Sequence, residues 1–479
     1  MKPENIKRLE QMLQPVRFKP TSVKKHPLDG RTPFDSDFSR IALSAPVRRL
    51  QDKTQVFPLA DYDFVRTRLT HSLDVMTMAR GLGINVEKAL ADKGWMDLIN
   101  RNDDLRNAIT KILEVASLVH DLGNPPFGHN GEKAIQKYFN NRNSFVGQHV
   151  FSVQLNDLER TDLQHIEGNT QGFRILRHLA LSDDEFSYNL TKPVLATIVK
   201  YPCCSLERND NRKGPFRKKF GFLEQDIKEY EEICATLGMT PGQRHPLTFL
   251  LEAADDIAYG VCDLEDGFKE GIITKDNIKE AITPENVQGN DYIISLVDEL
   301  CKDNSQLKDE ILMQKLRIAL HSNMIIACTE EFVNNIDAII EGQYHTSLLD
   351  GTKFKELNEA LGKIDIFNFE SEQVVGKEAI GIERMIYLLD GFASALILLN
   401  ENTSPLAPEF QLYEKISPNY RKAACDEGKD VPNSLYKKLL LASDYIFGMT
   451  DSFVHSVYED EEIGELILRV KCKIDSIVR

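Results

Sequence analysis

Apolar residues recur at helical spacing along most of this chain, and this periodicity constrains its fold more than any other feature of the sequence. Residues three or four positions apart share one face of a helix, and apolar faces of this kind occur within residues 73–79, 109–119, 247–258 and 385–392. Alternating patterns typical of β-strands are scarce, and only residues 55–59 could form a short strand or hairpin. The periodicity therefore predicts an all-α protein with at most a short β-hairpin.

The chain of 479 residues is long enough for two or three average domains, but no linker rich in Pro, Gly or Ser divides it. Side chains suited to binding metals or phosphates concentrate in residues 49–263. We therefore predict one large helical body over residues 1–479. Its catalytic core is expected at about 30–270, followed by a helical accessory or C-terminal region at about 271–479.

Composition excludes several classes of protein. No apolar stretch approaches the roughly 20 residues that cross a bilayer, and Met1–Asn5 lacks the apolar region of a signal peptide. We therefore expect a cytoplasmic protein without a membrane partner. Among eight cysteines, the adjacent Cys203 and Cys204 match neither the usual disulfide nor the usual zinc spacing, which favours reduced, buried thiols.

The formal net charge of −16 argues against a protein that wraps duplex DNA with its whole surface. A local basic segment at residues 207–220 is compatible with that charge. It is either a solvated, mobile loop or a contact for the phosphates of a small substrate or a single strand. Its cations are Arg208, Arg212, Lys213, Arg217, Lys218 and Lys219.

His120 and Asp121 stand together at the end of an apolar run, where Gly123 and two prolines are expected to end a helix. Imidazole and carboxylate are common ligands of divalent metals. His71 is expected to open another helix directly after Thr70, with Arg66 and Arg68 nearby, and two arginines at a helix N-terminus suit an anion.

His129 and Glu132 are three residues apart and share a helix face if helix resumes after the prolines. A carboxylate behind an imidazole fixes its tautomer and raises its basicity, which is the arrangement of an acid/base pair. The alternative is a capping histidine with a surface glutamate.

An apolar helix expected at residues 247–263 carries Asp255, Tyr259 and Asp263 four positions apart, as one polar stripe. Buried carboxylates are costly without a metal, a base or a ligand. Asp256 points to another side and is expected to be a satisfied structural carboxylate. His71, His120, Asp121 and Asp255 together would leave room for water or a phosphate oxygen on an octahedral ion, which suggests catalysis rather than structural zinc.

The order His…His-Asp…Asp resembles the signature of HD-domain metal phosphohydrolases. Four longer stretches resemble the deoxyguanosinetriphosphate triphosphohydrolase branch of that family, and the matching words span roughly residues 30–270. They are RRLQDKTQV (48–56), RTRLTHS (66–72), HDLGNPPFGH (120–129) and EAADDIAY (252–259).

This resemblance implies an HD-domain helical fold and hydrolysis of a deoxynucleoside triphosphate, with dGTP favoured, to deoxynucleoside and tripolyphosphate. It implies Mg, Mn or another transition metal on His71, His120, Asp121 and Asp255, and His129 held by Glu132 as the acid/base residue. It places Arg68, Lys200 and Tyr201 on the triphosphate, Tyr259 and Asp263 on the deoxyribose, and Arg49, Leu50 or Gln51 near the sugar or base.

Two alternatives stay open at this point. One is another HD phosphohydrolase, such as a deoxynucleoside 5′-monophosphatase or a cyclic-nucleotide phosphodiesterase, and the other is a nucleic-acid-binding regulatory protein. The resemblance also implies a homo-oligomer, with a single-stranded DNA or nucleotide effector as a further possibility. Beyond about residue 270 the match is weak, and Arg317 and His321 are expected to form a solvated or interhelical pair.

Overall fold

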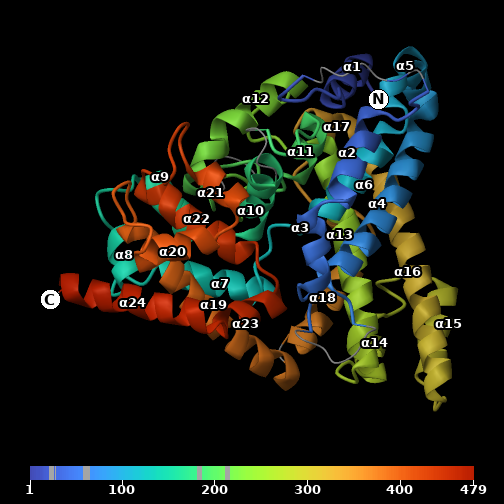
Figure 1. Ribbon diagram of the computed structural model, residues 1–479. Helices are drawn as coiled ribbons and strands as arrows, with labels where there is room; N and C mark the ends of the chain where they lie inside the picture. Colours follow the sequence, from blue (N-terminus) through green and yellow to red (C-terminus); the bar gives the residue numbers. More distant parts are fainter. Residues whose placement is uncertain are drawn as a thin grey trace.

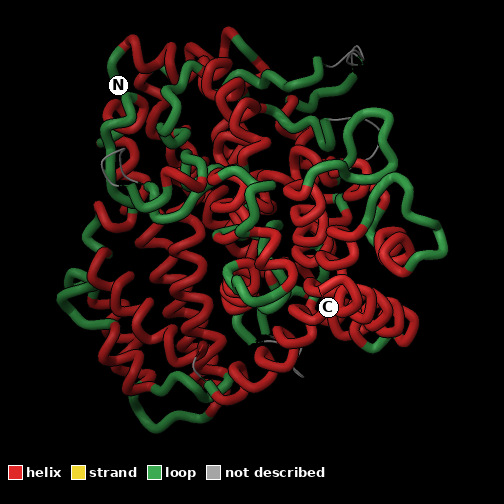
Figure 2. The backbone as a smooth tube through the Cα atoms, turned by 90° about the vertical axis from the view of Figure 1, so that its left-hand side faces the viewer, coloured by secondary structure: helices red, strands yellow, loops and turns green. Residues whose placement is uncertain are grey.

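The computed structural model describes residues 1–20, 26, 28–57, 65–180, 186–210, 216–369 and 371–478. Within these ranges the chain folds into helices joined by turns, and the only β-type pairing is an isolated bridge between Thr54 and Thr67 (Figure 2). The prediction of an all-α fold is confirmed. The stretch considered for a strand forms none in its described part, residues 55–57, and the rest of it lies outside the described residues.

The elements up to the long helix α13 are α1 (Pro3–Met12), α2 (Pro33–Ala42), α3 (Ala45–Arg49), α4 (Arg68–Leu90), α5 (Trp95–Arg101), α6 (Ala108–Val119), α7 (Gly128–Phe139), α8 (Phe145–Val150), α9 (Asp157–Gln164), α10 (Gly168–Arg174), α11 (Lys192–Ile198), α12 (Ile227–Leu237) and α13 (Pro246–Lys269). Those that follow are α14 (Lys275–Ala281), α15 (Asp291–Leu300), α16 (Gln306–Asn334), α17 (Ile336–Ile340), α18 (Lys355–Phe369), α19 (Glu372–Leu398), α20 (Pro408–Lys415), α21 (Pro418–Ala424), α22 (Leu435–Phe447), α23 (Asp451–Tyr458) and α24 (Glu461–Val478). Short turns of other helix types include η1 (Leu50–Asp52), η5 (Ser205–Glu207) and a π-helical turn at Ile175–Leu179.

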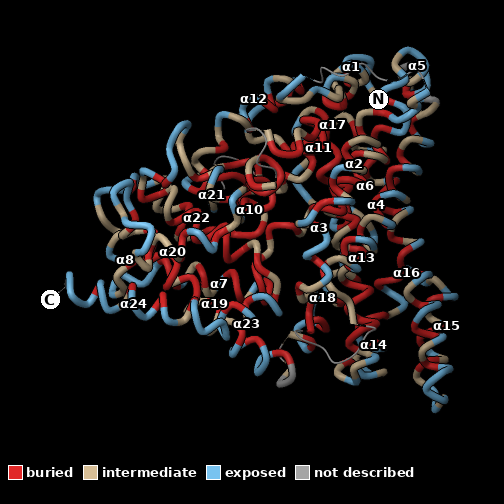
Figure 3. Tube along the Cα trace, viewed as in Figure 1, coloured by how far each residue is buried: buried red, intermediate tan, exposed pale blue. Residues whose placement is uncertain are grey.

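Two groups of helices make up the body. In one, α4 packs against α6, α13 and α16; in the other, α19 packs against α20, α22, α23 and α24 (Figure 1). Helix α19 also contacts α7 and α8, and α18 contacts both α13 and α19, which links the groups. One continuous cluster of buried apolar side chains runs from Leu9 to Ile474, and Figure 3 shows buried segments through both groups.

The start of α4 differs from the prediction. The helix begins at Arg68, three residues before His71, because Thr67 caps it. The Thr67 hydroxyl accepts from the Thr70 N–H (3.4 Å), and the Thr70 hydroxyl accepts from the Thr67 N–H (2.8 Å). This reciprocal pair places His71 in the first turns of the helix, facing its buried side.

Candidate active site

His120 follows the last residue of α6, a helix whose side chains are almost all buried. Its Nδ1 donates to the carbonyl oxygen of Ser117 (2.7 Å), so that in the neutral ring the lone pair is on Nε2. That nitrogen is buried without a hydrogen-bond partner among the described residues. It lies 3.6 Å from Oδ1 of Asp121 and 3.5 Å from Oδ1 of Asp255.

His71 approaches the same point from α4. Its Nε2 lies 3.2 Å from Oδ1 of Asp255, which projects from α13, and its ring centroid is 5.5 Å from that of His120. Ligand-type atoms of His71, His120 and Asp121 all lie within 4.8 Å of one another. Helices α4 and α13 and the two residues after α6 thus bring two imidazoles and two carboxylates together.

The charges of these two imidazoles and two carboxylates favour a bound cation. Burial lowers the pKa of His120, but Asp121 and Asp255 outweigh that effect and raise the pKa to about 9. Burial raises the pKa of Asp121, yet His120 and Arg68 bring it below its usual value. An orphaned imidazole nitrogen facing two ionised carboxylates is a donor set that fits a divalent metal ion.

A second convergent group, His178, Asp226 and Glu229, fits a metal less well. Glu229 already accepts from the guanidinium of Arg177 (2.8 Å), and Asp226 lies 2.8 Å from Nε2 of His178. Its carboxylates therefore have cationic or ring N–H partners within the protein.

Arg68 orients one of the metal-type ligands. Its Nη1 donates to Oδ2 of Asp121 (2.6 Å), while the Asn124 side-chain amide donates to Oδ1 (2.7 Å). Gly128 permits this approach, because a Cβ there would lie 2.8 Å from the Arg68 guanidinium and the backbone φ is +55°. The residue predicted to contact triphosphate is thus already paired with a carboxylate.

A cavity of about 210 Å³ opens beside these residues. Five of the thirteen predicted site residues line it: His120, Asp121, Lys200, Tyr201 and Asp255. The remaining lining residues are Asn124, Gly168, Asn169, Ile198, Lys219, Thr248, Leu251 and Glu252. Candidate metal ligands and candidate phosphate donors therefore share one space.

Lys200 enters the cavity just after α11. Its Nζ lies 3.4 Å from Oε1 of Glu252, and Arg244 also pairs with Glu252 through contacts of 2.6 and 3.2 Å. Burial lowers the pKa of Lys200, but Glu252 and Asp256 raise it well above its usual value. The lysine therefore stays charged.

His129 and Glu132 both lie on α7, and the predicted dyad is present as a contact of 3.5 Å between Nδ1 of His129 and Oε1 of Glu132. The imidazole is exposed and the carboxylate is buried. Glu132 also accepts from the Gly168 N–H (3.0 Å) and contacts Nζ of Lys219 (3.4 Å).

Lys219 is a cavity residue that the sequence did not single out. It belongs to the basic segment at residues 207–220, and its Nζ lies 2.6 Å from Glu167 as well as near Glu132. It lines the cavity, whereas Arg217 pairs with Glu207 (2.7 Å). Arg212 and Lys213 lie outside the described residues. The cluster of cations was the available signal, but it could not single out Lys219.

Tyr259 and Asp263 lie one and two turns beyond Asp255 on α13, away from the lining of this cavity. Both carboxylate oxygens of Asp263 are buried without a hydrogen-bond partner among the described residues. Burial and the neighbouring Asp365 raise the pKa of Asp263 well above its usual value. Asp256, expected to be structural, is also buried enough for its pKa to rise to about 7.

Arg49 and Gln51 are exposed and do not line the cavity. Arg49 donates to the Tyr420 hydroxyl (3.2 Å) and faces a separate cavity of about 290 Å³, with Tyr445 and Phe453 in its wall. The structure does not bring these two residues to the metal-type ligands.

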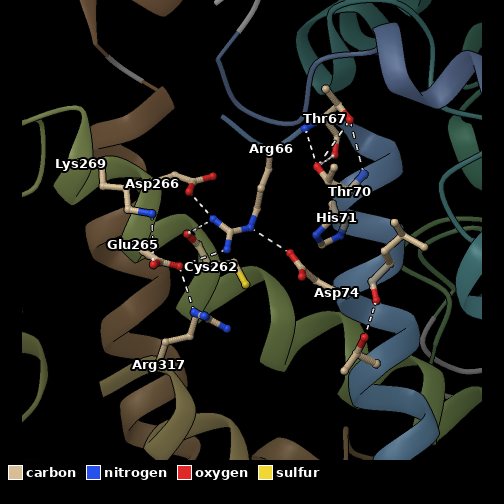
Figure 4. A network of polar contacts seen from close by, with 12 residues as sticks. Arg66, Thr67, Thr70, His71, Asp74, Cys262, Glu265, Asp266, Lys269 and Arg317 are labelled. Atoms are coloured by element: carbon tan, nitrogen blue, oxygen red, sulfur yellow. Dashed lines mark hydrogen bonds and ion pairs between the residues drawn. The ribbon is translucent and has the colours of Figure 1, made fainter. Parts of the chain in front are cut away.

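Arg66 binds the protein rather than an anion. Its guanidinium contacts Asp74 (2.9 Å), Glu265 (3.1 Å) and Asp266, which join α4 to α13 (Figure 4). Arg317 on α16 lies 3.0 Å from Glu265, so this arginine forms an interhelical ion pair, whereas Nε2 of His321 is buried without a hydrogen-bond partner among the described residues. The network fixes the two helices that carry His71 and Asp255.

An all-helical body that brings His, His-Asp and Asp to one point, from two helices and the end of a third, is that of an HD-domain phosphohydrolase. The HD-domain family profile matches residues 68–200.

Curated relatives are similar over most of the chain. One from Listeria monocytogenes, a deoxyguanosinetriphosphate triphosphohydrolase-like protein, is 36% identical over 444 residues, which cover 90% of this chain and 94% of the relative. A protein of the same name from Synechocystis is 32% identical, with 94% and 98% covered. A deoxyguanosinetriphosphate triphosphohydrolase from Serratia proteamaculans is 30% identical, with 89% and 92% covered. The chain belongs to the deoxyguanosinetriphosphate triphosphohydrolase family of HD-domain proteins.

In the described part of the chain, no helix has both the length and the apolar character that crossing a membrane requires.

Proposed function

We propose that this chain hydrolyses deoxynucleoside triphosphates, with dGTP favoured, to deoxynucleoside and tripolyphosphate by attack of water at the α-phosphorus. One observation carries the proposal: Lys200, Tyr201 and Lys219 line the same cavity as His120, Asp121 and Asp255. Donors for a polyphosphate chain thus lie beside ligands for a divalent ion. The names of the relatives support a deoxynucleoside triphosphate as substrate.

The charge of the cavity supports a need for metal. Its lining includes two lysines and three carboxylates, so once His120 has lost its proton to act as a ligand, the lining by itself is net negative and repels a polyanion. We assign His71, His120, Asp121 and Asp255 as the residues that would hold Mg²⁺, Mn²⁺ or another transition-metal ion. When bound, such an ion supplies charge neutralisation at the phosphate oxygens and favours deprotonation of water.

The remaining residues have separate roles in this proposal. Lys200, Lys219 and Tyr201 bind the phosphate chain, and Arg68 holds Asp121 in place. Water adds its oxygen to the α-phosphorus and releases a proton to solvent as the bond from phosphorus to the 5′-oxygen breaks. Protonated His129 gives a proton to the leaving 5′-oxygen and regains one from solvent, and Glu132 holds the imidazole in the correct orientation.

The sugar contacts are proposed on the buried, unpartnered carboxyl group of Asp263, which suits a ligand hydroxyl. Tyr259, one turn before it on α13, would exclude a 2′-hydroxyl. The assignment of Arg49 and Gln51 to the sugar or base, the homo-oligomer, and a nucleotide or single-stranded DNA effector stay predictions.

The test is to incubate the protein with each dNTP and Mg²⁺ or Mn²⁺ and to identify the phosphate product by phosphorus NMR. Tripolyphosphate with free deoxynucleoside supports the proposal. Pyrophosphate or orthophosphate would contradict it, and cleavage restricted to nucleoside monophosphates or cyclic nucleotides would favour another HD phosphohydrolase. Asp255→Asn serves as the inactive control.

A further inference from the structure

Asp451 connects the C-terminal helices to the loop that leads to His129. It is the first residue of α23 and is 2% exposed. Its Oδ1 accepts from the N–H of Phe127 (3.1 Å), which lies 324 positions earlier in the chain. Its Oδ2 accepts from the N–H of Thr54 (3.0 Å) and from the Thr54 hydroxyl.

Phe127 is the point where the loop turns into α7. Its φ is +59°, a left-handed conformation that a residue with a side chain adopts only with outside support. His129 follows two residues later. The Phe127 ring packs edge-on against His455 of α23 (6.0 Å between centroids), and a Cβ at Gly381 of α19 would lie 2.3 Å from it.

The other end of the loop is held from the same side. Nζ of the buried Lys53 donates to the carbonyl oxygen of Asn124 (2.6 Å) and to that of Phe447 at the end of α22 (2.7 Å). The Asn124 side chain in turn donates to Asp121. The loop between Asp121 and α7 is therefore fixed at both ends by hydrogen bonds that reach the C-terminal region.

We propose that Asp451 is a positioning residue for His129. Its carboxylate holds the Phe127 turn that begins α7, and so fixes where the first turn of that helix, with the imidazole, lies. The role of His129 as proton donor rests on the proposed function, but the hydrogen bond from Phe127 does not. A buried charge-assisted hydrogen bond is strong enough to hold such a turn.

The first test is amide hydrogen exchange in the metal-free protein. Asp451→Ala should speed exchange of the Phe127 amide about tenfold or more, because that N–H loses its buried acceptor. Asp451→Leu keeps a similar volume and removes both acceptor oxygens if the alanine variant does not fold. Ser452→Ala is the matched control, since the exposed Ser452 hydroxyl bonds Asp52 (2.8 Å) between the same two segments without touching the loop. Unchanged exchange at Phe127 in the folded Asp451 variants would overturn the proposal.

The second test is a double-mutant cycle on hydrolysis. Asp451→Ala should lower kcat on the order of 10- to 100-fold, as expected for a displaced catalytic group, while KM and metal affinity change less than about twofold. In a His129→Ala background the same substitution should cause no further loss. An additional loss there would show that Asp451 acts on the whole fold and would overturn the proposal. Absence of hydrolysis in the unaltered protein would instead refute the proposed function and leave the exchange result intact.

Discussion

Replacing Arg66 with methionine tests how the two helices that carry His71 and Asp255 are held together. Methionine keeps much of the apolar stem but removes the guanidinium from Asp74, Glu265 and Asp266. Glu265 retains Lys269 (3.2 Å) and Arg317 (3.0 Å). Asp266 is left as a buried carboxylate that has lost its ion pair.

The size of the effect follows from burial. The side chains of Arg66 and Asp266 are 15% and 4% exposed, so their contact counts as a buried ion pair. Removing one partner of such a pair costs roughly 3–5 kcal/mol, whereas the partly exposed pair with Asp74 contributes at most about 1 kcal/mol. We expect Arg66→Met to lower the free energy of unfolding by about 3 kcal/mol or more at pH 8.

The loss should depend on pH in a defined direction. Burial raises the pKa of Asp266 to about 6 even though Arg66 opposes that rise, so the pKa climbs further without Arg66. A carboxyl group with a folded-state pKa above its unfolded value binds more protons when folded, and stability increases as the pH falls through the folded pKa. The difference in free energy of unfolding between the unaltered protein and Arg66→Met should therefore be smaller at pH 5.5 than at pH 8.

Urea unfolding of Arg66→Met and of the double variant Arg66→Met/Asp266→Asn, at both pH values, measures this. The second substitution removes the unpaired charge and should restore at least about 2 kcal/mol at pH 8. The reasoning would be refuted if Arg66→Met lost the same free energy of unfolding at both pH values, or if the second substitution did not reduce that loss.

Three further predictions concern the site. Asp255→Asn should abolish stoichiometric metal binding while the protein stays folded; full binding by calorimetry would contradict the ligand assignment. Since the pKa of His120 is about 9 and its imidazole must lose the proton to bind a metal, metal affinity should fall as the pH drops below 9, by up to about tenfold per pH unit. Calorimetry in two buffers should find about one proton released per metal ion bound at pH 7.5, and binding without proton release would contradict this prediction. Lys219→Met should lower kcat/KM about 10- to 100-fold, whereas the exposed Lys218→Met should not; equal effects would remove Lys219 from the site.

The sequence predicted the local features of this molecule well. Apolar periodicity identified α6 and α13, and Gly123 with the prolines after it marked the end of the helix that precedes His120. The i, i+3 spacing of His129 and Glu132 predicted a shared helix face, which α7 provides. These features depend on neighbours in the chain, which is the information that periodicity contains.

Contacts between distant segments were not predictable in the same way. Lys219 reaches Glu132 across 87 positions, and Asp451 reaches Phe127 across 324. Such pairs depend on how helices pack in three dimensions, which spacing along one helix does not specify. For the same reason Arg66, read beside Arg68 as part of an anion site, proved to be paired with carboxylates of α4 and α13.

The fate of the attacking oxygen is the most direct measure of the central claim. Hydrolysis of dGTP in oxygen-18-labelled water should place one labelled oxygen in tripolyphosphate and none in the deoxynucleoside, because water attacks the α-phosphorus and the bond to the 5′-oxygen breaks. Mass spectrometry of both products reads this out. Label in the deoxynucleoside, or formation of deoxynucleoside monophosphate with pyrophosphate, would contradict the account.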